Sequence, residues 1–163
     1  MIDAEEARTD THQEVLLILA QTFDHEGVVL LCEPSVVGGR SGPPDIVVLD
    51  PASGVHVFEI KGTPLAQVRA VRAGGALEIA YESGMSRRDP SRQARQALFD
   101  IKDAATRHFN GDLNIEFQSW VIFPRIDRSH WEDKFGAAIA SRPDVIFREE
   151  LGLSRLGNWH LRR

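Results

Sequence analysis

The stretch PDIVVLDPASGVHVFEIK, residues 44–61, decides the fold of this chain. It holds two apolar runs rich in Val, Ile, Leu and Phe, joined by the turn sequence Asp50-Pro51-Ala52-Ser53-Gly54. Apolar runs bounded by turn residues are typical of β-strands, and Pro and Gly favour a short connecting loop. The stretch therefore predicts a β-hairpin that sets Asp45 opposite Glu59.

The same pairing sets Val47 opposite Val57. Because side chains alternate along a strand, Asp45, Glu59 and Lys61 then share one face at the open end of the hairpin. Two carboxylates at cross-strand distance repel each other, and a buried charge needs a partner or a metal ion. Lys61 can neutralise one carboxylate, whereas a hard divalent cation satisfies both. An ordinary ion pair at a strand end explains Glu59 and Lys61 alone, so Asp45 is what favours a functional site.

The order of these motifs resembles the PD-(D/E)xK nuclease signature, with Pro44-Asp45 followed, after a hairpin, by Glu59-Ile60-Lys61. Within that superfamily the chain is most similar to the nuclease-related (NERD) domain. Two further motifs support the likeness: Asp89-Pro90-x-x-Gln93-Ala94 opens a helix, and Trp120-Val-Ile-Phe-Pro124 ends a later strand. The resemblance implies an α/β fold with a restriction-endonuclease-like αβββαβ core, in which helices flank a mixed central sheet. It also implies a metal-dependent nuclease.

The resemblance implies roles for the residues of the hairpin. Asp45, Glu59 and the backbone carbonyl of Ile60 are expected to hold Mg²⁺ or Mn²⁺. Lys61 would orient the attacking water or neutralise the phosphate, and Gln93 would position substrate or water. The alternative for Lys61 is a plain salt bridge to one of the two acids.

In the resembled family an acidic residue on the first helix often faces the metal. Glu14 is the candidate here, with Asp10 and Glu6 as alternatives. A solvated helix face explains all three acids equally well, so both interpretations stay open.

Gln93 lies four residues before Ala97 and eight before Ile101, which predicts an amide on the buried face of its helix. A buried amide must be hydrogen-bonded, either to neighbouring backbone or to the metal site or a phosphate. The match to the family motif favours the second interpretation.

A cluster of arginines surrounds the predicted start of this helix. Such side chains contact phosphates and set the salt dependence of nucleic-acid binding, although a solvated surface is their more usual role. The candidate nucleic-acid-binding residues are Arg87, Arg88, Arg92 and Arg95, with Arg40 joining them from a Gly-rich loop.

The remaining segments follow from periodicity, turn residues and caps. Predicted helices cover 4–23, 90–109, 131–140 and 148–156, and predicted strands cover 28–32, 115–123 and 144–147. A second hairpin is predicted from 67–72 and 76–82, with a helix across 65–72 as the competing interpretation and a loop over 83–90.

Composition narrows the class of protein. The chain has 163 residues, of which 42% are hydrophobic, which predicts a single domain over 1–163 with a real core. No apolar run approaches a membrane span and the N-terminus is acidic, so we expect no membrane association and a cytoplasmic location. The single cysteine, Cys32, is expected to be a small buried strand residue.

Charge and histidine spacing exclude other classes of function. A net charge of −5 does not fit a general nucleic-acid coat protein, but a nuclease needs only a local basic rim. The six histidines are scattered, without the spacing of a zinc site. The Gly-rich loop that carries Arg40 lacks the G-K-[ST] sequence of a phosphate-binding P-loop.

Three functional interpretations remain open. The intact acid and lysine set favours a nuclease acting on nucleic acid, with DNA preferred to RNA. The alternative is a non-catalytic module that binds nucleic acid or a partner protein, and a weaker one is a structural module of a repair or defence complex. Because the resembled family is often fused to helicases, we expect a helicase as a candidate partner in cis or in trans, and the single domain over 1–163 is compatible with the N-terminal domain of a longer protein.

Overall fold

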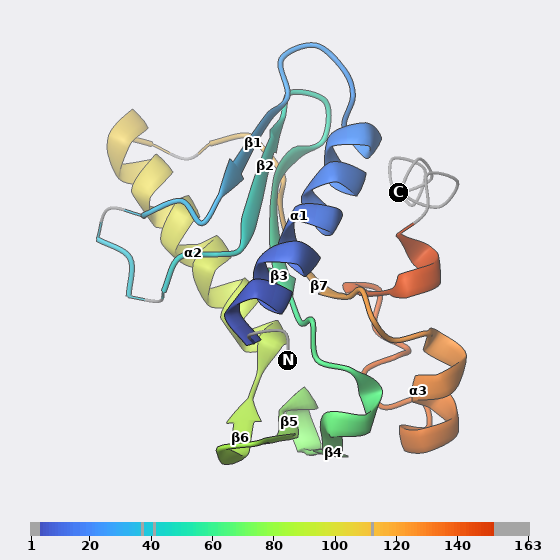
Figure 1. The fold of residues 1–163 in the computed structure, drawn as a ribbon. Helices are drawn as coiled ribbons and strands as arrows, with labels where there is room; N and C mark the ends of the chain where they lie inside the picture. The colour runs from blue at the N-terminus through green and yellow to red at the C-terminus, as the bar shows by residue number, and fades with distance from the viewer. Residues whose placement is uncertain (1–3, 37, 41, 112, 152–163) are drawn as a thin grey trace.

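The computed structural model describes residues 4–36, 38–40, 42–111 and 113–151, with side chains from residue 10 onward. A five-stranded mixed sheet in the order β1-β2-β3-β7-β8 forms the centre, and a separate antiparallel sheet has the order β4-β5-β6 (Figure 1). The predicted α/β class with a mixed sheet and flanking helices is confirmed. The elements are α1 (Ala4–Thr22), β1 (Val29–Cys32), β2 (Ile46–Asp50), β3 (Gly54–Ile60), β4 (Val68–Val71), β5 (Leu77–Tyr81), β6 (Gly84–Arg88), α2 (Pro90–Phe109), β7 (Phe117–Phe123), α3 (Arg128–Phe135) and β8 (Val145–Phe147).

The predicted hairpin is formed by β2 and β3 in the predicted register. Val47 pairs with Val57 and the ladder ends at the pair Ile46 and Phe58. Beyond that pair the chain places Asp45 and Glu59 at the open end. On its other side β3 pairs in parallel with β7, so it lies in the middle of the sheet and is buried along its length.

The alternation of side chains along β3 builds a core on each face of the sheet. Phe58 and Ile60 pack with Leu19 of α1 on one face, while Val57 packs with Ala97 of α2 on the other. The two helices therefore cover opposite faces of the central sheet. Glu59 lies between Phe58 and Ile60 in sequence and so belongs to the face that α2 covers.

The caps of α2 fix where this helix begins. The Asp89 carboxylate accepts a hydrogen bond from Arg92 N at 2.9 Å, and Pro90 occupies the first turn. Asn110 ends the helix in the left-handed region at φ 54°. These are the predicted start and end, and they set the first turn of α2 beside the open end of the hairpin.

The second hairpin is also confirmed, because β4 and β5 pair as antiparallel strands. The competing helix across 65–72 is wrong, and only a short 3-10 turn, Leu65–Gln67, is helical there. The predicted loop over 83–90 is also wrong, since β6 pairs with β5 from Gly84 to Arg88. Its residues are mostly exposed and polar, so no apolar alternation signals the strand.

Several smaller expectations differ from the structure. Cys32 is exposed because β1 is an edge strand with little burial. The predicted helix over 131–140 is shorter and earlier, as α3 shows, and of the predicted terminal helix only Arg148–Glu150 forms a 3-10 turn. Residues 152–156 of that prediction lie outside the described residues. Among the helices of the described segments, none has the length and apolarity to cross a membrane.

A chain of polar contacts closes the turn of the β2–β3 hairpin. Trp120 Nε1 donates to His56 Nδ1 at 3.2 Å, and His56 Nε2 lies 2.7 Å from Ser53 Oγ, which in turn donates to Asp50. An indole nitrogen only donates, so Nδ1 of His56 must be the acceptor and the proton of the neutral ring sits on Nε2. His56 is therefore packed inside the hairpin, and it fixes the turn.

Asp50 is the acidic end of this chain of contacts. The side chain is buried, which opposes its ionisation, but hydrogen bonds from Ser53, from the backbone of Ala52 and from His25 outweigh burial and hold the pKa of Asp50 below its ordinary value. The charged carboxylate is thus the form that the fold favours.

This pKa shift predicts a defined acid sensitivity. Because the pKa of Asp50 is lower in the folded than in the unfolded chain, its stabilisation is present above the usual value near 3.8 and is lost as pH falls through the folded value. We expect Asp50→Asn to lower the free energy of unfolding at pH 7 and to differ progressively less from the wild type below about pH 4. Urea titrations at several pH values measure this, and a difference independent of pH would contradict it.

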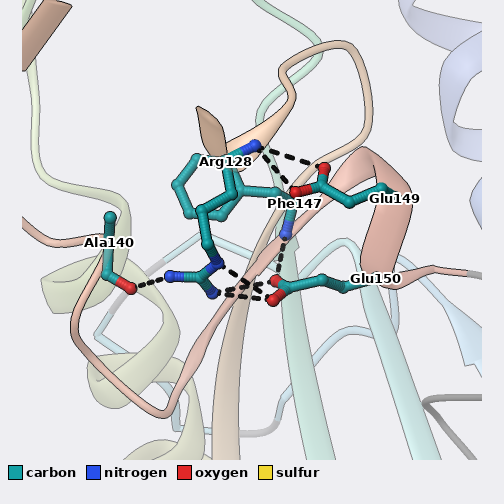
Figure 2. Close-up of polar contacts among 5 residues, drawn as sticks. All are labelled: Arg128, Ala140, Phe147, Glu149 and Glu150. Carbon is teal, nitrogen blue, oxygen red and sulfur yellow. Dashed lines mark hydrogen bonds and ion pairs between the residues drawn. The ribbon is translucent and has the colours of Figure 1, made fainter. Parts of the chain in front are cut away.

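Arg128, at the start of α3, joins that helix to the end of the sheet. Its guanidinium donates from Nε and Nη2 to the two carboxylate oxygens of Glu150, at 3.0 and 2.9 Å, and from Nη1 to the Ala140 carbonyl. Figure 2 shows the fork pointing at Glu150, with Glu149 receiving the Arg128 backbone N–H. The guanidinium also lies 4.9 Å from the centre of the Phe147 ring.

The paired hydrogen bonds from Arg128 to Glu150 and the contact with the Phe147 ring both require a planar guanidinium. We therefore expect Arg128→Lys to lower the free energy of unfolding by about 2 kcal/mol, the order of a lost charged hydrogen bond. Urea unfolding checks this, with Arg95→Lys, at an exposed position on α2, as the matched control. Equal stability of the two variants would show that the charge alone is sufficient at position 128.

Candidate functional site

A cavity of about 950 Å³ lies at the carboxyl end of β3. The segment just before β2, the loop after β3, the middle of α1 and the first turns of α2 all contribute to its wall. Asp45, Glu59 and Lys61 line it together, as does Gln93. The three charged residues predicted from the hairpin are therefore brought together in one place.

Asp45 is buried, with 7% of its surface exposed, and its carboxylate is fixed by the backbone. Oδ2 accepts a hydrogen bond from Ile60 N at 2.7 Å. This contact takes the place of the strand partner that Ile60 would have if β2 began two residues earlier. Because the N–H and C=O of one strand residue point to the same side, the Ile60 carbonyl is directed toward the Asp45 side of β3.

Glu59 and Lys61 form an ion pair in the cavity wall. Lys61 Nζ donates to Glu59 Oε1 at 2.5 Å, and the exposed fractions of the two side chains are 16% and 10%. The Lys61 backbone N–H donates to Ile122 O at 2.8 Å, which extends the parallel pairing with β7 by one bond. The salt bridge that the sequence left open as an alternative role for Lys61 is thus present, on the face of the hairpin that carries Asp45.

The prediction of a buried Gln93 is wrong, because its side chain is exposed. Ala94 and Ala97 form the buried stripe as expected. Position 93 points in nearly the same direction as Ala97, but the sheet ends below the first turn of α2. The amide therefore lies over the cavity instead of over the sheet, and it still lines the site.

The expectation of an acidic ligand on the first helix is not met by Glu14. Glu14 is exposed and does not line the cavity, Asp10 is also exposed, and the side chain of Glu6 lies outside the described residues. The residues of α1 that line the cavity are Thr11 and His12. Thr11 and His12 precede the predicted Glu14 by three and two residues along α1, and Glu14 faces solvent.

The predicted arginines divide into two groups. Arg87, Arg88 and Arg92 line the cavity, whereas Arg40 and Arg95 are exposed and do not. The backbone N–H of Arg40 donates to Asp100 Oδ2 at 3.0 Å, which ties the Gly-rich loop to α2.

Sequence reasoning missed Arg125, which also lines the cavity. Its Nε and Nη2 donate to Thr11 Oγ1 at 3.1 and 2.8 Å, and Thr11 is 2% exposed. A signal was present: Arg125 follows β7, and the carboxyl ends of parallel strands meet at one edge of a sheet. The residues after β3 and after β7 are therefore neighbours.

Two further side chains near Asp45 were also missed. Ligand atoms of His12, Glu33 and Asp45 all lie within 4.8 Å of one another, and His12 Nε2 is 4.0 Å from Asp45 Oδ1. Among the described residues, these three form the group of His, Cys, Asp or Glu side chains with a spacing that suits one ion. Glu59 is not a member of the group. The three residues come from separate parts of the sequence, so no local motif predicts the group.

The charge of the cavity differs from that of the whole chain. Its wall carries the cations Lys61, Arg87, Arg88, Arg92 and Arg125 and the carboxylates Asp45, Glu59 and Asp89. Cations therefore outnumber acids here, although the net charge of the chain is −5. The excess of cations is therefore local to the cavity.

Comparison with family models, with curated proteins and with solved structures gives no significant match for this chain.

Proposed function

We propose that this protein is a divalent-metal-dependent nuclease that hydrolyses phosphodiester bonds of nucleic acid, DNA in preference to RNA. The observation that supports the proposal is the convergence of Asp45, Glu59 and Lys61 in one cavity whose rim is rich in arginine. A phosphodiester is anionic, and its hydrolysis requires both charge stabilisation and an activated water. The cavity offers groups for each requirement.

The donor set fits a hard cation. Asp45, Glu59 and the Ile60 carbonyl would hold Mg²⁺ or Mn²⁺, since both ions prefer oxygen ligands. A bound ion supplies Lewis acidity and lowers the pKa of a coordinated water. The hydrogen bond from Ile60 N keeps the Asp45 carboxylate in place without the ion.

The remaining side chains act directly on the substrate. Lys61 is a compact cation that neutralises charge on the phosphate as the bond breaks. Gln93, exposed at the rim, donates from its amide to substrate or water. Arg87, Arg88 and Arg92 contact phosphates on the α2 side, while Arg125 contacts them from the sheet side.

One observation favours the second candidate, a non-catalytic nucleic-acid-binding module. Glu59 Oε1 lies 2.5 Å from Lys61 Nζ. Glu59 is not a member of the group His12, Glu33 and Asp45, whose ligand atoms have a spacing that suits one ion. A module that only binds would keep this pair and the arginine rim. A helicase partner in cis or in trans is proposed from the sequence resemblance and is compatible with either candidate. A cytoplasmic location is proposed from the lack of an apolar span in the sequence and its acidic N-terminus.

Lys61→Ala separates the two candidates. A nuclease loses the group that offsets phosphate charge, so we expect cleavage to fall at least about a hundredfold, the scale of one lost electrostatic contact to the transition state. Supercoiled, linear and single-stranded DNA are incubated with Mn²⁺, with Lys102→Ala, an exposed lysine of α2, as the matched control. Circular dichroism checks that the fold is intact.

Asp45→Asn and Glu59→Gln complete this experiment. Both are expected to abolish metal-dependent cleavage while binding of DNA remains. Full activity of Lys61→Ala would remove the catalytic role of Lys61. Binding of DNA without cleavage by the wild type would remove the catalytic proposal and leave the binding module.

Arg125 and Thr11 give a separate prediction for binding. We expect Arg125→Ala to weaken DNA binding and to reduce the slope of log K against log salt by about one, because one phosphate contact is lost. Thr11→Val keeps the charge, so the slope stays while affinity falls because the guanidinium is no longer oriented. Fluorescence anisotropy without metal measures both, with Arg95→Ala as the control outside the cavity. Equal effects of Arg125→Ala and Arg95→Ala would rule out a phosphate contact at Arg125.

A further inference from the structure

Three potential metal ligands meet at the edge of the cavity from three separate elements. His12 comes from α1, Glu33 directly follows β1, and Asp45 directly precedes β2. Asp45 is buried, the side chain of His12 is 19% exposed, and Glu33 is exposed. The group therefore has a fixed inner side and an outer side open to solvent.

The spacing of the donors suits a shared ion better than a direct contact. His12 Nε2 and Asp45 Oδ1 are 4.0 Å apart, which is beyond hydrogen-bonding distance. Two ligands that each lie about 2.1 Å from one ion are separated by at most about 4.2 Å. The three donors, all within 4.8 Å of one another, can reach this geometry by small side-chain rotations.

The backbone holds two of the ligands in position. Glu33 N donates to Asp45 O at 2.9 Å, which extends the pairing of β1 with β2 by one step. Asp45 Oδ2 accepts from Ile60 N, so the carboxylate is oriented with Oδ1 toward His12. The two oxygens of Asp45 thus have different surroundings, one against the backbone and one facing the imidazole.

We propose that His12, Glu33 and Asp45 bind a divalent transition-metal ion of the Zn²⁺ or Mn²⁺ class. One imidazole with two carboxylates suits such ions, whereas Mg²⁺ prefers an all-oxygen shell and retains its water. Three protein ligands and an open outer side leave at least one position for water. This site goes beyond the proposed nuclease: it shares Asp45 with it, but it requires neither Glu59 nor any cleavage.

Such an ion has a structural consequence. The ion joins α1 to the end of β1 and to the beginning of β2. The apolar core between α1 and the sheet links the same elements. An ion that binds the folded but not the unfolded chain raises the melting temperature. The site thereby gives a readout that is independent of any enzymatic activity.

The test uses the metal alone. Zn²⁺ is added to the wild-type protein and to His12→Ala, Glu33→Gln and Glu59→Gln, with His108→Ala, an exposed histidine near the end of α2, as the matched control. Calorimetry gives the affinity, thermal melting gives the shift, and NMR of the histidine rings of the wild type identifies the nitrogen that binds. Losing a ligand is expected to cost at least about tenfold in affinity, the lower bound for a lost supporting group.

The expected result is a Zn²⁺-dependent shift of the His12 ring, weaker binding in His12→Ala and Glu33→Gln, and wild-type binding in Glu59→Gln and His108→Ala. An unperturbed His12 ring, or a loss of binding confined to Glu59→Gln, overturns the proposal. The ring signal comes from the wild type, so misfolding of a variant cannot conceal the answer. Cleavage lost in Glu59→Gln with Zn²⁺ binding retained separates this site from the nuclease proposal.

Discussion

The hydrogen bond from Ile60 N to Asp45 Oδ2 is the contact on which the candidate site depends. It forms just before β2 begins and opposite the last residue of β3, so a side chain satisfies a backbone N–H that would otherwise lack its strand partner. Because a buried N–H must be paired, the carboxylate is held at the mouth of the hairpin by the requirements of the backbone. The position of Asp45 is therefore a consequence of the fold.

Much of the fold could be predicted because local and tertiary preferences agree. The β2–β3 hairpin combines β-branched runs, a turn sequence and alternation, and its register was predicted correctly. The helix α2 carries an N-cap at Asp89, Pro90 at its start and Asn110 at its end. β6 lacked such agreement, since its pairing with β5 comes from a tight turn and not from apolar residues of its own.

The candidate site was predicted only where one hairpin determines it. Asp45, Glu59 and Lys61 follow from strand alternation, but Gln93 required knowing where the sheet ends beneath α2. His12 and Arg125 reach the cavity through the packing of α1 and through the parallel pairing of β3 with β7. Sequence periodicity places a residue on a face of its own element, and it does not specify which part of another element lies opposite.

The edge position of β1 has a consequence for the behaviour of the protein at high concentration. Within the described part of the chain, the outer side of β1 has no neighbouring strand, and Val29 and Leu31 are 45% and 37% exposed. An open apolar edge is a template for pairing with another chain. Glu33 and Pro34 come directly after the strand, and a charge followed by a residue without an N–H limits how far such pairing extends. We therefore expect these two residues to limit aggregation through this edge.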